Sequence, residues 1–271
     1  MIPPFVATTL IIGLGVFLHH PLGPSICRPA VAVRLTARSD VPSRVPAVQA
    51  DDFAQLVKRL KSQSPVDRRE AAEHLGDLGD HRALEPLTSA LKDSSADVRA
   101  AAANALGEIG DKAAADDLIG LLKDQVEFVR SAAARVLGQL GDPRAVAPLI
   151  AALRDSSSSV RSSAALGLGG LKDRQAVDEL IPKLRDEAPD VRAAAATALG
   201  ELRDKRAVQP LMNLLKDDYR NVKVSAALAL ADIGDRSVED SIRQVIDAEK
   251  DPEARSQMSE ALKRLSAAKK D

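Results

Sequence analysis

Apolar residues recur at three- and four-residue spacing through most of the chain after residue 50, which is the spacing of one face of an α-helix. One clear stripe comprises Val98, Ala101, Ala102, Ala105, Leu106 and Ile109. A second stripe follows at Leu118, Ile119 and Leu122. Between them, Gly110 supplies a helix stop with positive φ, and Asp111 is placed to cap the next helix. The pattern predicts a first and a second helix joined by a tight turn.

This helix pair recurs every 31 residues. The aspartate after the first helix returns without insertion as Asp80, Asp111, Asp142, Asp173, Asp204 and Asp235. A leucine followed by a small residue keeps the same register, from Leu75 and Gly76 onward. Residues 51–62 match a lone second helix and residues 252–267 a lone first helix, so half-repeats cap both ends. The sequence predicts an all-α protein, an α-solenoid of six 31-residue two-helix repeats with half-repeat caps, over residues 51–271.

Prolines and glycines refine the expected repeat. Three copies place a proline near the start of the second helix: Pro86, Pro148 and Pro210. Because proline has no N–H, it belongs in the first helical turn, and the residues before it should form a turn or short 3₁₀ segment. The small residue after each leucine implies a close helix crossing, because a mid-helix glycine otherwise costs about 1 kcal/mol relative to alanine. Lys172 and Arg203 replace the stop glycine in two copies, at a local cost.

A basic series has the same period as the aspartates: Arg99, Arg130, Arg161, Arg192 and then Lys223. A charged strip for a ligand is one interpretation. We favour a ladder of caps and side-chain bonds that ties neighbouring repeats together.

The repeated motif resembles a known family. The pattern D-V-R-x-A-A-x-A-L-G-x-I-G-D followed by R-A-V-x-P-L-I-x-A-L-K-D is clearest at 97–111, 142–155 and 190–217. It resembles the HEAT-like repeats named for the phycobilin lyases. The resemblance implies a right-handed superhelical solenoid. It is specific for fold and much less so for function, because such repeats serve many roles.

Composition narrows the function classes. The chain has no Trp, one Tyr and four Phe, so stacking groups for nucleic acid are nearly absent. The first fifty residues hold four of the 38 basic residues and one of the 39 acidic ones, which leaves 34 and 38, a net charge of −4, from residue 51 on. This balance gives no reason to expect a nucleic-acid partner.

The N-terminal residues form a leader over 1–33 and a linker over 34–50. Residues 5–18 are uninterruptedly apolar, short for a membrane span and suited to a signal-peptide core. No Lys or Arg precedes this run, and four Arg follow it, which would keep the downstream domain in the cytoplasm. We expect an exported or membrane-associated protein, with the cytoplasm or a mis-assigned start as alternatives. Residues 34–50 are rich in Pro, Ser and Arg and read as a disordered linker.

Enzyme functions are disfavoured. The resemblance implies two enzyme alternatives, a lyase and a metal-dependent hydroxylase that holds iron with His-Glu pairs in both halves of its array. Here Glu73-His74 has the reversed order, His81 precedes an arginine, and no histidine follows residue 81. Cys27 lies in the leader. We expect no catalytic, cofactor-binding or metal-binding residue and no cofactor.

The remaining interpretation is an interaction scaffold. By family resemblance, the second helices line the concave face. Their outward positions vary from copy to copy, and the candidate partner-binding residues are Glu85, Ser89, Asp116, Asp117, Asp178, Glu179, Lys183, Gln209, Asn213, Asp240 and Gln244. We expect a monomer that binds another protein of basic or mixed charge on this face, with a possible membrane tether through residues 5–18.

Overall fold

A computed structural model describes residues 50–267 of the chain. The predicted leader, nearly all of the predicted linker and residues 268–271 lie outside this part. Within residues 50–267 every regular element is a helix, as the all-α solenoid prediction required. No helix in this part is long and apolar enough to cross a membrane.

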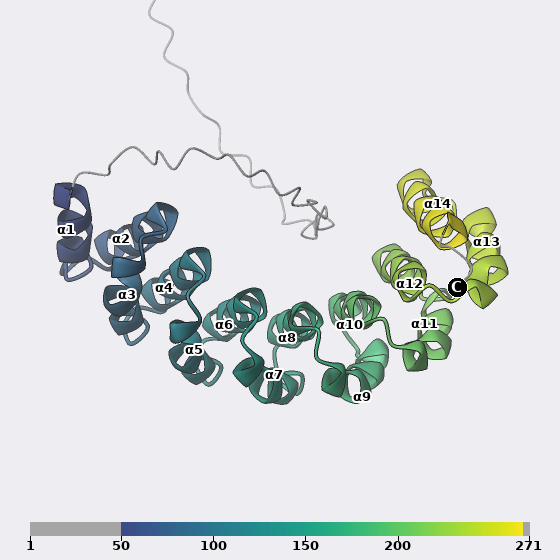
Figure 1. Cartoon of the computed structure of the whole chain (residues 1–271), viewed down its shortest axis with the longest axis horizontal. Helices are drawn as coiled ribbons and strands as arrows, with labels where there is room; N and C mark the ends of the chain where they lie inside the picture. The colour runs from purple at the N-terminus through teal and green to yellow at the C-terminus, as the bar shows by residue number, and fades with distance from the viewer. Residues whose placement is uncertain (1–49, 268–271) are drawn as a thin grey trace, which may run out of the picture. The chain divides into compact units, whose positions relative to one another are not determined.

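The helices form two rows (Figure 1). The first helices of the six repeats, followed by a lone first helix at the end, are α2 (Pro65–Leu78), α4 (Ala96–Ile109), α6 (Glu127–Leu140), α8 (Ser158–Leu171), α10 (Pro189–Leu202), α12 (Arg220–Ile233) and α14 (Pro252–Ala267). The second row begins with the lone second helix and comprises α1 (Ala50–Arg59), α3 (Leu84–Ala90), α5 (Ala115–Leu121), α7 (Val146–Ala152), α9 (Val177–Leu180), α11 (Val208–Leu214) and α13 (Glu239–Ala248).

A 3₁₀ segment leads into each second helix after α1, as the prolines predicted. These segments are η1 (His81–Ala83), η2 (Lys112–Ala114), η3 (Pro143–Ala145), η4 (Arg174–Ala176), η6 (Lys205–Ala207) and η7 (Arg236–Val238). The aspartate before each one caps it. In η2, the Asp111 carboxylate accepts the N–H of Ala113 at 2.9 Å. The capping role predicted for the aspartate series is therefore confirmed.

The fourth repeat departs from this plan. Its α-helix ends at Leu180 and continues as the 3₁₀ helix η5 (Ile181–Arg185). Pro182 lies in the second turn of this stretch, three residues later than the register of Pro86 and Pro148. Without an N–H it cannot continue the i→i−4 ladder, so the backbone tightens instead.

The first helices end in the left-handed region. The stop glycines Gly79, Gly110, Gly141 and Gly234 have positive φ. Lys172 and Arg203 adopt the same conformation, with φ of 56° and 51°. The local cost expected at these two positions is thus present in the backbone.

The core lies between the two rows. Its largest fully buried side chains are leucines at repeating positions of both rows: Leu75, Leu87, Leu106, Leu118, Leu137, Leu149, Leu153, Leu168, Leu180, Leu199, Leu211 and Leu230. Burying one such side chain stabilises the fold by about 1.5–3 kcal/mol. Each repeat therefore depends on its neighbours to cover its leucines.

Small residues bring neighbouring first helices close together. A Cβ at Gly138 would stand 2.3 Å from the Cα of Gly167 on the next first helix. A Cβ at Gly76 would stand 2.8 Å from the Cα of Ala105, with equivalent approaches at the later repeats. The predicted close crossing is confirmed. In contrast, a Cβ at Gly107 would meet the side chain of Val136 rather than backbone, so this crossing is wider.

This packing decides which row is on the inside of the curve. Neighbouring first helices pack along their lengths, whereas neighbouring second helices have few contacts with one another. The array consequently curves toward the closely packed row, and Figure 1 shows the first helices on the inner side and the second helices on the outer side. The expectation that second helices line the concave side is therefore wrong for this protein.

Candidate interaction surfaces

A ladder of arginine–aspartate pairs runs along one edge of the array. Arg99, in the first turn of α4, donates from Nε and Nη2 to the two carboxylate oxygens of Asp124 at 2.7 and 2.9 Å. Its Nη1 donates to the carbonyls of Asp93 and Ser94 at 2.9 and 3.3 Å. The Asp124 carboxylate also accepts the N–H of Val126. One guanidinium thus joins the loop before its own helix to the loop before the next first helix.

The same geometry recurs in four other repeats, through Arg68–Asp93, Arg130–Asp155, Arg161–Asp186 and Arg192–Asp217. Lys223 and Glu249 form the corresponding pair in the last repeat. The hydrogen bond from Arg99 lowers the pKa of Asp124 below its ordinary value. The prediction that side-chain bonds of the basic series tie neighbouring repeats together is confirmed. Its carboxylates belong to a second aspartate series, which shares the 31-residue period and was missed.

The predicted partner-binding residues all belong to the outer row. Several of their carboxylates already have cationic partners. Asp116 pairs with Arg144 at 2.6 Å, Asp178 pairs with Arg206 at 2.6 Å, and Glu179 pairs with Arg154 at 3.0 Å. The structure places these residues outside the curve. Contact with a partner stays a prediction for them.

The inner face consists of the stripe on each first helix that points away from the second helices. Phe128 on α6 and Leu166 on α8 belong to this stripe, and each is 45% exposed. Large apolar side chains on a surface of this kind are candidates for contact with another molecule. The sequence does distinguish these two positions, because other copies of the repeat have polar residues there. Asp97 is the equivalent of Phe128, and Asn104 is the equivalent of Leu166.

Carboxylates flank these apolar residues on the same face. They are Glu73 and Asp77 on α2, Asp97 and Glu108 on α4, Asp190 and Glu201 on α10, and Asp232 on α12. Burial, and then the nearby charge of Asp77, raise the pKa of Glu108. Burial raises the pKa of Glu201. The positive charge of Lys172 opposes this shift, and the negative charge of Asp232 adds to it.

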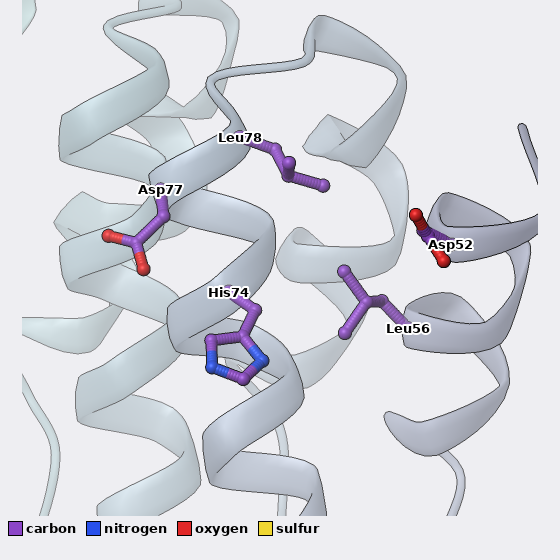
Figure 2. A pocket seen from close by; sticks show the side chains of 5 residues that line it. All are labelled: Asp52, Leu56, His74, Asp77 and Leu78. Carbon is purple, nitrogen blue, oxygen red and sulfur yellow. The ribbon is translucent and has the colours of Figure 1, made fainter. Parts of the chain in front are cut away.

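A small depression lies between α1 and α2 (Figure 2). Its volume is about 320 Å³, at the lower end of the range for ligand pockets. Figure 2 shows Leu56 and Leu78 pointing into the space between the two helices, with Asp77 turned away from α1. His74 at its edge is exposed, and His81 is bonded to Asp111 at 3.2 Å. In residues 50–267 no three His, Cys, Asp or Glu side chains come together as a metal site.

Comparison with solved structures shows the fold. The complex of CpcE and CpcF of phycocyanin lyase from Nostoc sp. PCC7120 is 22% identical with a TM-score of 0.56, covering 79% of this chain and 94% of that chain. YibA from E. coli is 22% identical with a TM-score of 0.60, covering 81% of this chain and 83% of that chain. An engineered protein is 23% identical with a TM-score of 0.53, covering 67% of this chain and 98% of that chain.

Comparison of the sequence with curated proteins found no match. The sequence model of HEAT repeats matches residues 53–138, 113–166 and 146–223, which together span more than half of the chain. This match agrees with the period, the two-row architecture and the resemblance of the repeated motif. The chain belongs to the HEAT repeats family.

Proposed function

We propose that this protein is an interaction scaffold that binds another protein on the inner face of its first helices. The observation that carries the proposal is the exposure of two large apolar side chains, Phe128 and Leu166, on neighbouring first helices of the inner row. A few well-packed side chains near the centre of a protein interface commonly provide most of its binding energy. The HEAT-repeat fold is compatible with this role, and one similar structure is itself a complex of two proteins.

A catalytic role has less support. One similar structure belongs to a lyase, but at 22% identity that likeness concerns the fold. The depression beside His74 is small, and its described lining holds two leucines, two aspartates and that histidine. We therefore propose a binding function without catalysis, cofactor or resident metal.

The proposal is tested by capture of partners onto the full-length chain from the native cell extract. Three forms are compared: wild type, Phe128→Ala with Leu166→Ala, and charge reversal of Asp116, Asp117, Asp178 and Glu179. Both altered residue sets lie on the surface, and matching circular-dichroism melting curves establish that all three forms are folded. We expect a specific protein to be retained by wild type and by the charge-reversed outer form, and lost from the inner-face form.

Retention of that protein by the inner-face form, with loss from the outer form, would instead assign binding to the second helices. Retention of no specific protein by any form would contradict the scaffold function. Size-exclusion chromatography with light scattering checks the expected monomer.

The leader supports a separate proposal. We propose that residues 5–18 direct export or membrane association, because this run is apolar and of signal-peptide length. Cell fractionation of the full chain and of a form lacking residues 1–33 tests it. Equal cytoplasmic recovery of both forms would contradict the proposal.

A further inference from the structure

The middle of the inner face differs from its two flanks. On α6 and α8 the exposed and half-buried positions of the inner-face stripe carry Phe128, Ser131, Arg135, Gln139, Ser159, Ser162, Leu166 and Gly170. None of these residues is acidic; the one exposed carboxylate on the two helices is Glu127, in the first turn of α6. Arg135 donates to Asn104 at 2.6 Å and to Gln139 at 3.1 Å, so one positive charge stands over α6. Apart from Arg135, the side chains of this set are apolar or neutral.

One row of equivalent positions crosses this centre. The penultimate residues of six consecutive first helices are Asp77, Glu108, Gln139, Gly170, Glu201 and Asp232. The two middle members are neutral, and the two members on either side are acidic. Leu166 lies one helical turn before Gly170. An exposed apolar side chain thus stands beside the neutral centre of the row.

Helix stability does not account for these carboxylates. They lie in the last turn of their helices, where the negative end of the helix dipole disfavours an acidic side chain. Within residues 50–267, Asp77, Glu108 and Glu201 form no ion pair, whereas Asp232 pairs with Arg264, and Asp116 and Asp178 of the outer row pair with Arg144 and Arg206. Burial raises the pKa of Glu108 and of Glu201, so it disfavours their ionised forms. A cation from a partner would relieve this cost.

We propose that the inner face binds an elongated protein segment with an apolar centre and with lysine or arginine on both sides of that centre. The apolar centre contacts Leu166, and the basic residues contact Glu108 with Asp77 on one side and Glu201 on the other. This inference rests on the proposed scaffold function and adds the chemistry of the partner.

The helix spacing sets the length of the segment. Glu108 and Glu201 are three helices apart in the first row, and neighbouring packed helices lie about 8–10 Å apart, so they span roughly 24–30 Å. An extended chain covers about 3.3 Å per residue, so about seven to nine residues separate the two basic groups. Charge complementarity of this type fixes the register of a bound segment.

A random library of 16-residue peptides tests the inference. The library is panned on the full-length wild-type chain, and the enriched pool is then applied to variants. Glu108→Gln with Glu201→Gln removes two inner charges with little change of shape. Asp116→Asn with Asp178→Asn removes two outer charges and is the matched control. Leu166→Ala removes the apolar contact, and melting curves verify that each variant is folded.

We expect enriched peptides to carry Lys or Arg on both sides of an apolar stretch. Their binding should weaken about fivefold to tenfold in the Glu108/Glu201 variant and by tenfold or more in the Leu166 variant. It should change less than twofold in the outer control. Enriched peptides that are acidic or uncharged, or binding unaffected by the inner-face variants, would overturn the partner chemistry and leave a protein-binding function in place. No enrichment by wild type would contradict both proposals.

Discussion

Gly138 on α6 and Gly167 on α8 lie so close that a Cβ on Gly138 would stand 2.3 Å from the Cα of Gly167. Real side chains do not approach backbone this closely. The pair therefore sets the distance between the two helices at the centre of the inner face. Because the equivalent positions elsewhere are alanine or valine, side-chain size tunes the spacing from repeat to repeat.

Gly138→Ala should destabilise the protein by about 1–3 kcal/mol, because the added methyl group forces two backbones apart. Gly120→Ala is the matched control, since Gly120 is a helical residue of α5 with open space around its Cβ position. That change should stabilise the protein by up to about 1 kcal/mol through helix propensity. Urea denaturation measures both. Equal effects of the two substitutions would contradict the crossing described here.

Arg161→Ala should cost about 2–4 kcal/mol, because it leaves the buried Asp186 carboxylate and the carbonyls of Asp155 and Ser156 without their donor. Arg161→Lys should recover part of this loss, because lysine keeps the charge without the planar fork. The control is Arg154→Ala, whose exposed pair with Glu179 should contribute less than about 1 kcal/mol. A loss at Arg154 equal to that at Arg161 would argue against the ladder as the main tie between repeats.

Asp142 should titrate far below its ordinary pKa of 3.8. The side-chain hydrogen bonds from Arg144, followed by the Arg144 N–H, lower the pKa of Asp142 to about 2. A lowered folded-state pKa contributes stability that is fully present above pH 3.8 and is lost as the pH falls toward 2. The stability difference between wild type and Asp142→Asn should therefore shrink over this window. Carbon-detected NMR of the Asp142 carboxyl checks the pKa directly, and an unshifted midpoint would refute the cap geometry.

Arg203→Gly should stabilise the protein by about 1 kcal/mol, because glycine adopts the observed φ of 51° without steric cost. The reverse change at an equivalent stop, Gly141→Arg, should destabilise it by a similar amount. Thermal unfolding should shift by about 2–4 °C in opposite directions for the two variants. A drop in melting temperature for Arg203→Gly would mean that the arginine side chain makes stabilising contacts larger than its backbone cost.

Local features of the fold were predictable from the sequence. Asp111 caps the 3₁₀ segment and Gly110 ends the helix because both effects depend on nearby backbone. The break of the second helix in the fourth repeat also has a visible cause, the later position of Pro182. The partner of Arg99 was not predictable from spacing, because the aspartate series of Asp111 and that of Asp124 share one 31-residue period. Spacing alone does not say which of the two series lies close to the arginines.

The candidate surface was the least predictable feature. Which row lies inside the curve depends on contacts between repeats, such as Gly138 with Gly167 and Gly107 with Val136. A 31-residue period shows that these contacts recur, but not which neighbour each residue meets. The concave residues were consequently assigned to the wrong row, and Leu166 was overlooked.

The most direct test of the inner-face claim is site-specific photo-crosslinking in the native cells. A photoreactive amino acid replaces Leu166 on the inner face in one form of the full chain, and Asn213 on the outer face in another. We expect a discrete adduct with a second protein from position 166 and none from position 213. An adduct from position 213 with none from position 166 would contradict binding on the inner face.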